Sequence, residues 1–285
     1  MMAKAAARVL SASKKALVSM RIVALICLCV ASLYGQQNPS AKPADAAQSN
    51  QQKARTLIDQ MIQALGGQAY LNAQDYYAEG RLGNFHNETL VAWGLYYRFW
   101  KWPDKDRIEL TKQRDIVQLF VGDQVYEITY KGIHPIDLQK EEKLRQGVVR
   151  RYYSLENVLR EWFKEPNILL LDEGPSISEG HLGEKVTIIN AKNESVTLIV
   201  DTTTHLPLEK RFSTRDPRYR DRDEEVTIYG DWKEIQGINT PRMTVTKRNG
   251  ETISQQIILN ISYNTHPPES LFDPAVAKIN PVKAQ

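Results

Sequence analysis

The chain has 285 residues and carries 37 lysines and arginines against 34 aspartates and glutamates. Five of these basic residues and none of the acidic ones lie in residues 1–35, so 32 basic residues accompany 34 acidic ones in the rest of the chain. A protein that binds nucleic acid through its phosphates needs a concentrated basic surface. The charge balance therefore argues against this class and predicts no nucleic-acid partner.

Residues 1–35 have the pattern of a secretory signal peptide. A basic segment precedes the uncharged, apolar residues 22–35, which is typical of an export signal. An ordinary membrane-spanning helix needs roughly 20 apolar residues, so we expect cleavage near Gly35, with an uncleaved N-terminal anchor as the alternative. The mature protein would be exported to the periplasm or cell envelope, with peripheral rather than integral membrane contact.

Both cysteines, Cys27 and Cys29, lie inside this signal. The mature protein is therefore expected to have neither disulfides nor thiol chemistry. A lipid-anchor cysteine follows a small residue, whereas Ile26 and Leu28 precede these two, so the sequence does not favour lipidation.

The remainder of the chain divides into a linker and one domain. Residues 36–51 are rich in Gln, Ala, Ser and Pro, a composition that predicts a flexible polar linker. Residues 52–285 are enough for a single domain with a substantial core.

A helix is predicted over residues 53–65. Its apolar residues recur at helical spacing, and Gly66 and Gly67 follow as a stop signal. We expect the apolar face to be buried against a sheet. That face consists of Ala54, Leu57, Ile58, Met61, Ile62 and Leu65.

Residues 87–102 alternate with a period of two, as a β-strand does. One face is mixed and the other is apolar and aromatic. The apolar face comprises Val91, Trp93, Leu95, Tyr97 and Phe99. Farther along, two apolar runs flank Gly122–Asp123, which predicts a hairpin over residues 115–130.

Helical spacing returns in the middle of the chain. The apolar positions of residues 137–163 recur every three or four residues, with a break expected near Gly147 or Ser154. Pro166 then ends the helical segment.

Short strands joined by tight turns are predicted for the rest of the chain. Residues 230–245 illustrate the pattern of strand, turn and strand, with Gly237, Asn239 and Pro241 in the bend. About ten or eleven strands are expected in all, and their spacing indicates an antiparallel meander. Because a sheet of this size twists and curls, we predict a mainly β (α+β) fold, a strongly curved antiparallel half-barrel with helices covering its concave face. Other turns are expected at residues 190–194, 201–207 and 249–250.

The sequence has no clear catalytic or metal-binding motif. The segment GPSISEG, residues 174–180, resembles a nucleophile elbow but has Ser178 where the motif needs glycine. The densest charge run, residues 213–225, indicates a solvated loop, with a docking surface for a partner as the alternative. We therefore predict no catalytic residues, no metal and no cofactor. The histidines, none of them at ligand spacing, are His86, His134, His181, His205 and His266.

Several segments in order along the chain resemble the LolA-like superfamily, the exported lipoprotein-sorting and lipoprotein-carrier proteins of bacterial envelopes. Together they cover nearly all of residues 52–275. The segments are ALGG at the end of the first helix, FWKWPDKDRIEL, VGDQVYEI, VTLIVDTTTHLPLEKRF, IYGDWKEIQGINTPRMTV and ILNISYNTHPPESLFDPA.

This resemblance implies an open half-barrel with an apolar cavity that holds acyl chains. Transferring an acyl chain from water is worth ~0.8 kcal/mol per methylene, so a lipid or lipidated protein needs such a carrier. On this hypothesis the protein is not an enzyme and its partner is a lipid or lipidated protein. The predicted cavity residues are Leu57, Met61, Val91, Trp93, Leu95, Tyr97 and Phe99.

Two alternatives remain open at this point. The domain could lack a cavity and act as a protein-interaction module of the cell envelope, similar to accessory domains of exported peptidases, with an envelope protein as its partner. It could also be a hydrolase with a dispersed active site.

Overall fold

The computed structural model describes residues 43–215 and 222–279. The predicted signal peptide, residues 1–35, lies outside the described residues, as does the central part of the charge run, residues 216–221. The chain divides into two compact units, residues 1–48 and Ser49–Gln285. Of the first unit only residues 43–48 are described, and they are helical.

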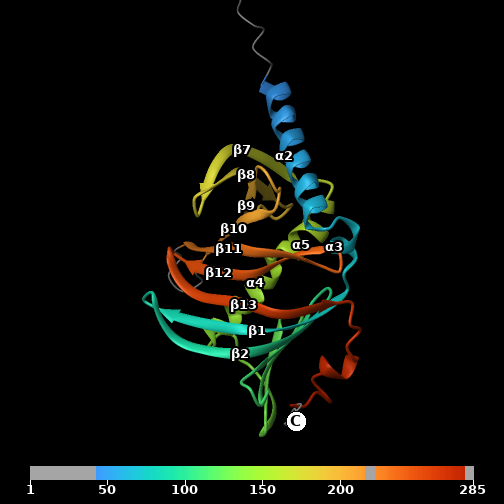
Figure 1. Ribbon diagram of the computed structural model, residues 1–285, viewed down its shortest axis with the longest axis vertical. Coiled ribbons are helices and arrows are strands. Elements are labelled where there is room, and N and C mark those ends of the chain that lie inside the picture. The colour runs from blue at the N-terminus through green and yellow to red at the C-terminus, as the bar shows by residue number, and fades with distance from the viewer. Residues whose placement is uncertain (1–42, 216–221, 280–285) are drawn as a thin grey trace, which may run out of the picture. The chain divides into compact units, whose positions relative to one another are not determined.

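The second unit is built on one antiparallel sheet that is strongly curved and not closed (Figure 1). Two meanders make up the sheet, one from β1 to β6 and one from β7 to β13, and the pairing of β1 with β13 joins them. The described strands are β1 (Asp75–His86), β2 (Thr89–Lys101), β3 (Lys105–Leu110), β4 (Ile116–Val121), β5 (Gln124–Thr129), β6 (Gly132–Pro135), β7 (Leu169–Ser178), β8 (His181–Ile189), β9 (Ser195–Asp201), β10 (Pro207–Arg215), β11 (Arg222–Ile235), β12 (Ile238–Arg248) and β13 (Glu251–Tyr263).

The prediction of a mainly β, antiparallel fold is confirmed, but the described part has thirteen strands rather than ten or eleven. The two missed strands are β1 and β6. Glycines interrupt the alternation of apolar and polar residues in β1. They are needed because aromatic rings lie against the backbone of this strand. A Cβ added at Gly80 would come within 2.6 Å of the Tyr96 ring, and one at Gly83 within 2.6 Å of the Trp93 ring.

Helix α2 confirms the predicted apolar stripe. Ala54, Ile58 and Met61 are fully buried and pack in a core with residues of β7 to β10. The helix ends where predicted, because Gly66 and Gly67 adopt positive φ angles that glycine tolerates. The described helices are α2 (Pro43–Leu65), α3 (Gln68–Asn72), α4 (Glu142–Tyr152) and α5 (Leu155–Arg160), with 3-10 turns η1 (Trp162–Lys164) and η2 (Glu269–Leu271).

The start of α2 differs from the prediction. The helix begins at Pro43 rather than at residue 53, so residues 43–51 of the expected flexible linker are helical. The Asn50 side chain accepts a hydrogen bond from the Asp172 N–H at 2.9 Å and donates one to its C=O at 2.7 Å. This pairing ties the polar part of the helix to the edge strand β7, which local composition does not reveal.

The break in the middle helical segment falls at one of the two predicted positions. Ser154 separates α4 from α5 and caps α5, because its Oγ accepts a hydrogen bond from the Asn157 N–H at 3.1 Å. Gly147 lies inside α4 and does not break it.

The predicted tight turns are present, with one correction. Gln236 and Gly237 alone form the turn between β11 and β12, both with positive φ, whereas Asn239 and Pro241 lie in β12. A two-residue turn with positive φ matches the twist of an antiparallel pair, so the bend needs no further residues.

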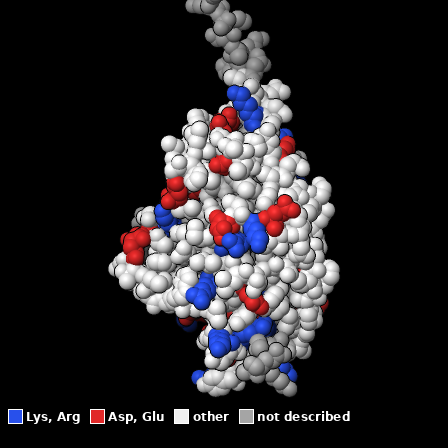
Figure 2. Space-filling view, in the orientation of Figure 1, with Lys and Arg blue, Asp and Glu red and all other residues white. Residues whose placement is uncertain are grey.

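The described residues of the charge run are strands rather than the predicted loop. Its described ends belong to β10 and β11, and Glu225 is 3% exposed. On the face seen in Figure 2, basic and acidic residues are interspersed rather than gathered in one basic patch.

Candidate ligand cavity

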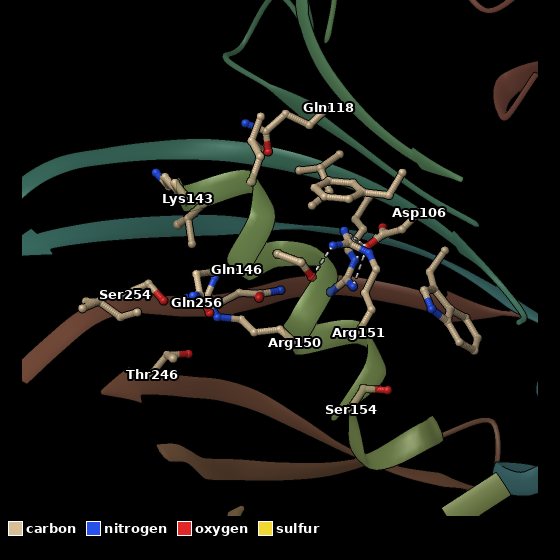
Figure 3. Close-up of a pocket in the computed structure, with 18 of the residues that line it drawn as sticks. Asp106, Gln118, Lys143, Gln146, Arg150, Arg151, Ser154, Thr246, Ser254 and Gln256 are labelled. Atoms are coloured by element: carbon tan, nitrogen blue, oxygen red, sulfur yellow. Dashed lines mark hydrogen bonds and ion pairs between the residues drawn. The ribbon is translucent and has the colours of Figure 1, made fainter. Parts of the chain in front are cut away.

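A cavity of about 750 Å³ lies between α4 and the sheet. Strands β1 to β4, β12 and β13 form its walls together with the inner face of α4 (Figure 3). Its volume lies within the range of roughly 300–1,000 Å³ typical of small-ligand sites. The apolar and aromatic residues that line it are Tyr76, Leu82, Phe85, Val91, Trp100, Trp102, Pro103, Ile108, Phe120, Leu144 and Ile253.

Strand alternation and one bulge decide which residues of β2 reach the cavity. Arg98 and Trp100 line it, two residues apart as alternation requires. The pairing of β1 with β2 shifts register between Asn84 and Phe85, and Val91 is the unpaired residue on β2. Such a bulge re-aims side chains, so Val91 also lines the cavity.

Of the predicted cavity residues, the structure places only Val91 in the cavity wall. Met61 is fully buried in the core of α2 and β7 to β10, and Leu57 packs against it. The helix that lines the cavity is therefore α4 and not the predicted residues 53–65.

The other predicted residues lie elsewhere on β2. Phe99 packs against Tyr77, with ring centroids 4.7 Å apart, and against a second small core at β4 and β5. The Arg114 guanidinium lies 4.5 Å from the Tyr97 ring centroid. Trp93 is 40% exposed, and Leu95 is half-buried. These four residues do not line the cavity.

A buried charge cluster stands in one wall of the cavity. Asp106 is fully buried and accepts two hydrogen bonds from Arg98, at 2.9 and 2.8 Å, and a third from Arg151. Burial raises the pKa of Asp106, but the two guanidinium groups outweigh this effect, so its pKa lies below the ordinary value. The carboxylate is therefore ionised and holds α4 against β3.

A second set of charges connects α4 with β11, β12 and β1. Arg150 donates to Glu225 at 2.6 Å, and Arg248 approaches the other oxygen of Glu225 at 3.6 Å. Lys143 donates to the Asn84 side-chain oxygen at 2.9 Å. Loss of hydration and the charge of Arg150 lower the pKa of Lys143 below its ordinary value.

The sequence prediction missed the polar residues of α4. Lys143, Gln146 and Arg150 recur at i, i+3 and i+7, and all three line the cavity. This spacing is itself a helical stripe, so the signal is present in the sequence, although it resembles an ordinary solvent-exposed helix face.

This arrangement can hold an apolar chain beside polar and charged groups.

Within residues 43–215 and 222–279, no cluster of three or more His, Cys, Asp or Glu side chains is arranged to hold a metal ion. In the same described ranges, no helix is both long enough and apolar enough to span a bilayer.

The chain matches no known family model, and no curated protein matches it significantly. Solved structures do match. A DUF1329 family protein from Desulfovibrio piger ATCC 29098 has a TM-score of 0.55 at 12% identity, over 78% of this chain and 98% of its own.

Two further structures are similar to this chain. An outer membrane lipoprotein-sorting protein domain from Vibrio parahaemolyticus has a TM-score of 0.53 at 11% identity, over 81% of this chain and 98% of its own. A LolA superfamily protein from Nitrosomonas europaea has a TM-score of 0.50 at 10% identity, over 77% of this chain and 97% of its own. At such identities the likeness concerns the fold, and the chain therefore has a LolA-like fold, as its sequence resemblance implied.

Proposed function

We propose that the protein is an exported, non-catalytic protein of the cell envelope that holds the acyl part of a lipid or lipidated protein. In this proposal α4 and the concave side of the sheet enclose the ligand. The pattern of residues 1–35 supports export, and the similarity to a lipoprotein-sorting domain supports the envelope as the location.

The cavity is the observation that carries this proposal. Its lining includes aliphatic side chains such as Leu82, Ile108 and Ile253, and each methylene that leaves water for such surroundings contributes about 0.8 kcal/mol. A binding function also needs no reactive group, because holding an acyl chain requires burial alone.

Lipid extraction tests the proposal. Protein purified without detergent is extracted with organic solvent, and the extract is quantified by mass spectrometry against the protein. We expect an acyl species in stoichiometric amount and saturable binding of a fluorescent fatty acid. Clean extracts together with no fatty-acid binding would contradict the proposal and favour the protein-interaction module.

A matched pair of variants locates the bound lipid. Leu144→Trp adds a bulky ring to the cavity lining, so it should reduce the amount of bound fatty acid severalfold. Leu182→Trp is the control, because Leu182 is 56% exposed and lies outside the cavity lining. Equal loss in both variants would place the ligand elsewhere.

A further inference from the structure

One end of the cavity is lined by polar side chains from both α4 and the sheet. Asn84 of β1 pairs with Ser254 of β13, and Ser254 pairs with Thr246 of β12. These three side chains therefore form a row across neighbouring strands, and all three line the cavity. In Figure 3, Lys143 and Arg150 extend from α4 toward the side of the cavity where Ser254 and Thr246 lie.

This end has unused hydrogen-bond donors. Within the described residues, the hydroxyl groups of Ser254 and Thr246 form no hydrogen bond with another protein group. The Lys143 ammonium has the neutral Asn84 amide as its partner there, which leaves N–H donors available. Arg248 Nη2 is buried and makes no hydrogen bond.

Among the described residues, the net charge of the side chains at this end is positive. Glu225 accepts from Arg150 and also faces Arg248, so one carboxylate serves two guanidinium groups. Glu142 pairs with Arg145 and lies 3.9 Å from Arg248. Lys143 adds a further positive charge, and its partner among the described residues is the neutral Asn84 amide. A cavity wall of excess positive charge and free hydroxyl donors favours an anion.

The opposite part of the cavity suits a hydrocarbon chain. Ile108 and Phe120 line it from β3 and β4, and Trp100 lies beside them on β2. The Arg98 and Arg151 side chains at this end are already bound to Asp106. The cavity therefore has a cationic end and an aromatic end.

We propose that the ligand is an amphiphile with a single anionic head group, phosphate or carboxylate, bound by Lys143, Thr246 and Ser254. Its acyl chain extends along Ile108 and Phe120. This inference rests on the proposed function and specifies the chemistry of its ligand, since an acyl chain alone would need no such end.

Soluble single-chain lipids test the head group. Displacement of a fluorescent fatty acid is measured with lysophosphatidylglycerol and with the uncharged monoacylglycerol of the same chain length, both below their micelle concentrations. Oleate and oleyl alcohol form a second pair, which separates a carboxylate from a neutral head. Inorganic phosphate alone is the third arm. We expect each anionic lipid to bind about tenfold more tightly than its partner, and inorganic phosphate to compete only weakly.

Variants assign the effect to this end of the cavity. Lys143→Gln should reduce the preference for the anionic lipid about fivefold to tenfold, and Ser254→Ala should reduce it by a smaller factor. Both variants should weaken the binding of oleate more than the binding of oleyl alcohol. Lys140→Gln is the control, because the Lys140 side chain is 81% exposed and pairs with Asp137. Thermal unfolding of each variant establishes that it is folded before binding is measured.

The outcomes separate the two proposals. Equal affinity for charged and neutral lipids, unchanged by Lys143→Gln and Ser254→Ala, would overturn the anionic head group and leave lipid binding intact. No binding of any acyl compound would overturn the proposed function itself. Binding of inorganic phosphate as tight as that of lysophosphatidylglycerol would show a free-anion site and overturn the amphiphile.

Discussion

The two halves of the sheet each pack against helices, but the helices meet the sheet with different side chains. Helix α2 turns Ala54, Ile58 and Met61 toward β7 to β10, and these residues are fully buried. Helix α4 turns Lys143, Gln146 and Arg150 toward β1, β12 and β13, and a cavity of about 750 Å³ remains. The side chains on the inner face of a helix thus decide whether a curved sheet is filled or left open.

The physical reason lies in hydration. Aliphatic side chains gain free energy when they pack closely against one another, so the apolar face of α2 packs directly on its half of the sheet. Charged side chains lose hydration when they are buried without partners, so α4 is held by specific ion pairs instead. The Asp106 cluster is the main ionic connection of this kind, because it links α4 with β2 and β3.

Of the changes considered, removal of the Asp106 charge should lower the stability of the half that contains the cavity the most. Asp106→Asn leaves the half-buried Arg98 and Arg151 without a counter-charge, which costs at most about 3–5 kcal/mol of unfolding free energy. Urea denaturation monitored by fluorescence measures this loss. A loss below about 1 kcal/mol would mean that water already solvates the two guanidinium groups.

Truncation of one leucine on each helix compares how tightly the two halves are packed. Leu65 is 1% exposed in the filled half, so Leu65→Ala should cost about 2–5 kcal/mol of unfolding free energy. Leu144 is half-buried at the cavity, and Leu144→Ala should cost less than half as much. Equal losses in chemical denaturation would show that both halves are packed to the same density.

The smallest expected effect is a pH dependence at the junction of α4 and α5. Lys210 is buried, and its Nζ donates to the Tyr153 carbonyl at 2.7 Å. Burial lowers the pKa of Lys210 to about 8. Between this value and the unfolded pKa near 10.4, the unfolded chain binds more protons than the folded one. Stability should therefore rise with pH in this window, by at most about 1.4 kcal/mol per pH unit.

The measurement must stop below the ionisation of tyrosine. Burial raises the pKa of Tyr153 to about 12, and tyrosines of this kind lower stability once the pH passes their unfolded pKa of about 10. Urea denaturation at pH values from about 7.5 to 9.5 avoids this opposing effect. Lys210→Met should reduce the rise, with Lys143 contributing a part that remains because its pKa is also lowered. A variant with the same slope as the parent protein would contradict the assignment to Lys210.

Local patterns in the sequence were sufficient for much of the fold. The stripe of α2, the stop at Gly66 and the turn at Gly122–Asp123 depend on neighbouring residues only, so their prediction succeeded. The strand β1 was missed because its glycines are required by aromatic rings on another strand. Gly80 leaves room for the Tyr96 ring, and this contact cannot be inferred from the local pattern of β1.

The residues that line the cavity could not be predicted from local patterns for a related reason. Alternation along β2 divides its residues into two faces but does not say which face meets a helix. The bulge at Val91 then changes the face partway along the strand. The sequence by itself determined most of the elements, the antiparallel class and the LolA-like resemblance, because these depend on periodicity and order. Only the tertiary structure decided that Arg98 and Trp100 face α4 and that Trp93 and Phe99 do not, because that choice depends on which distant segments pack together.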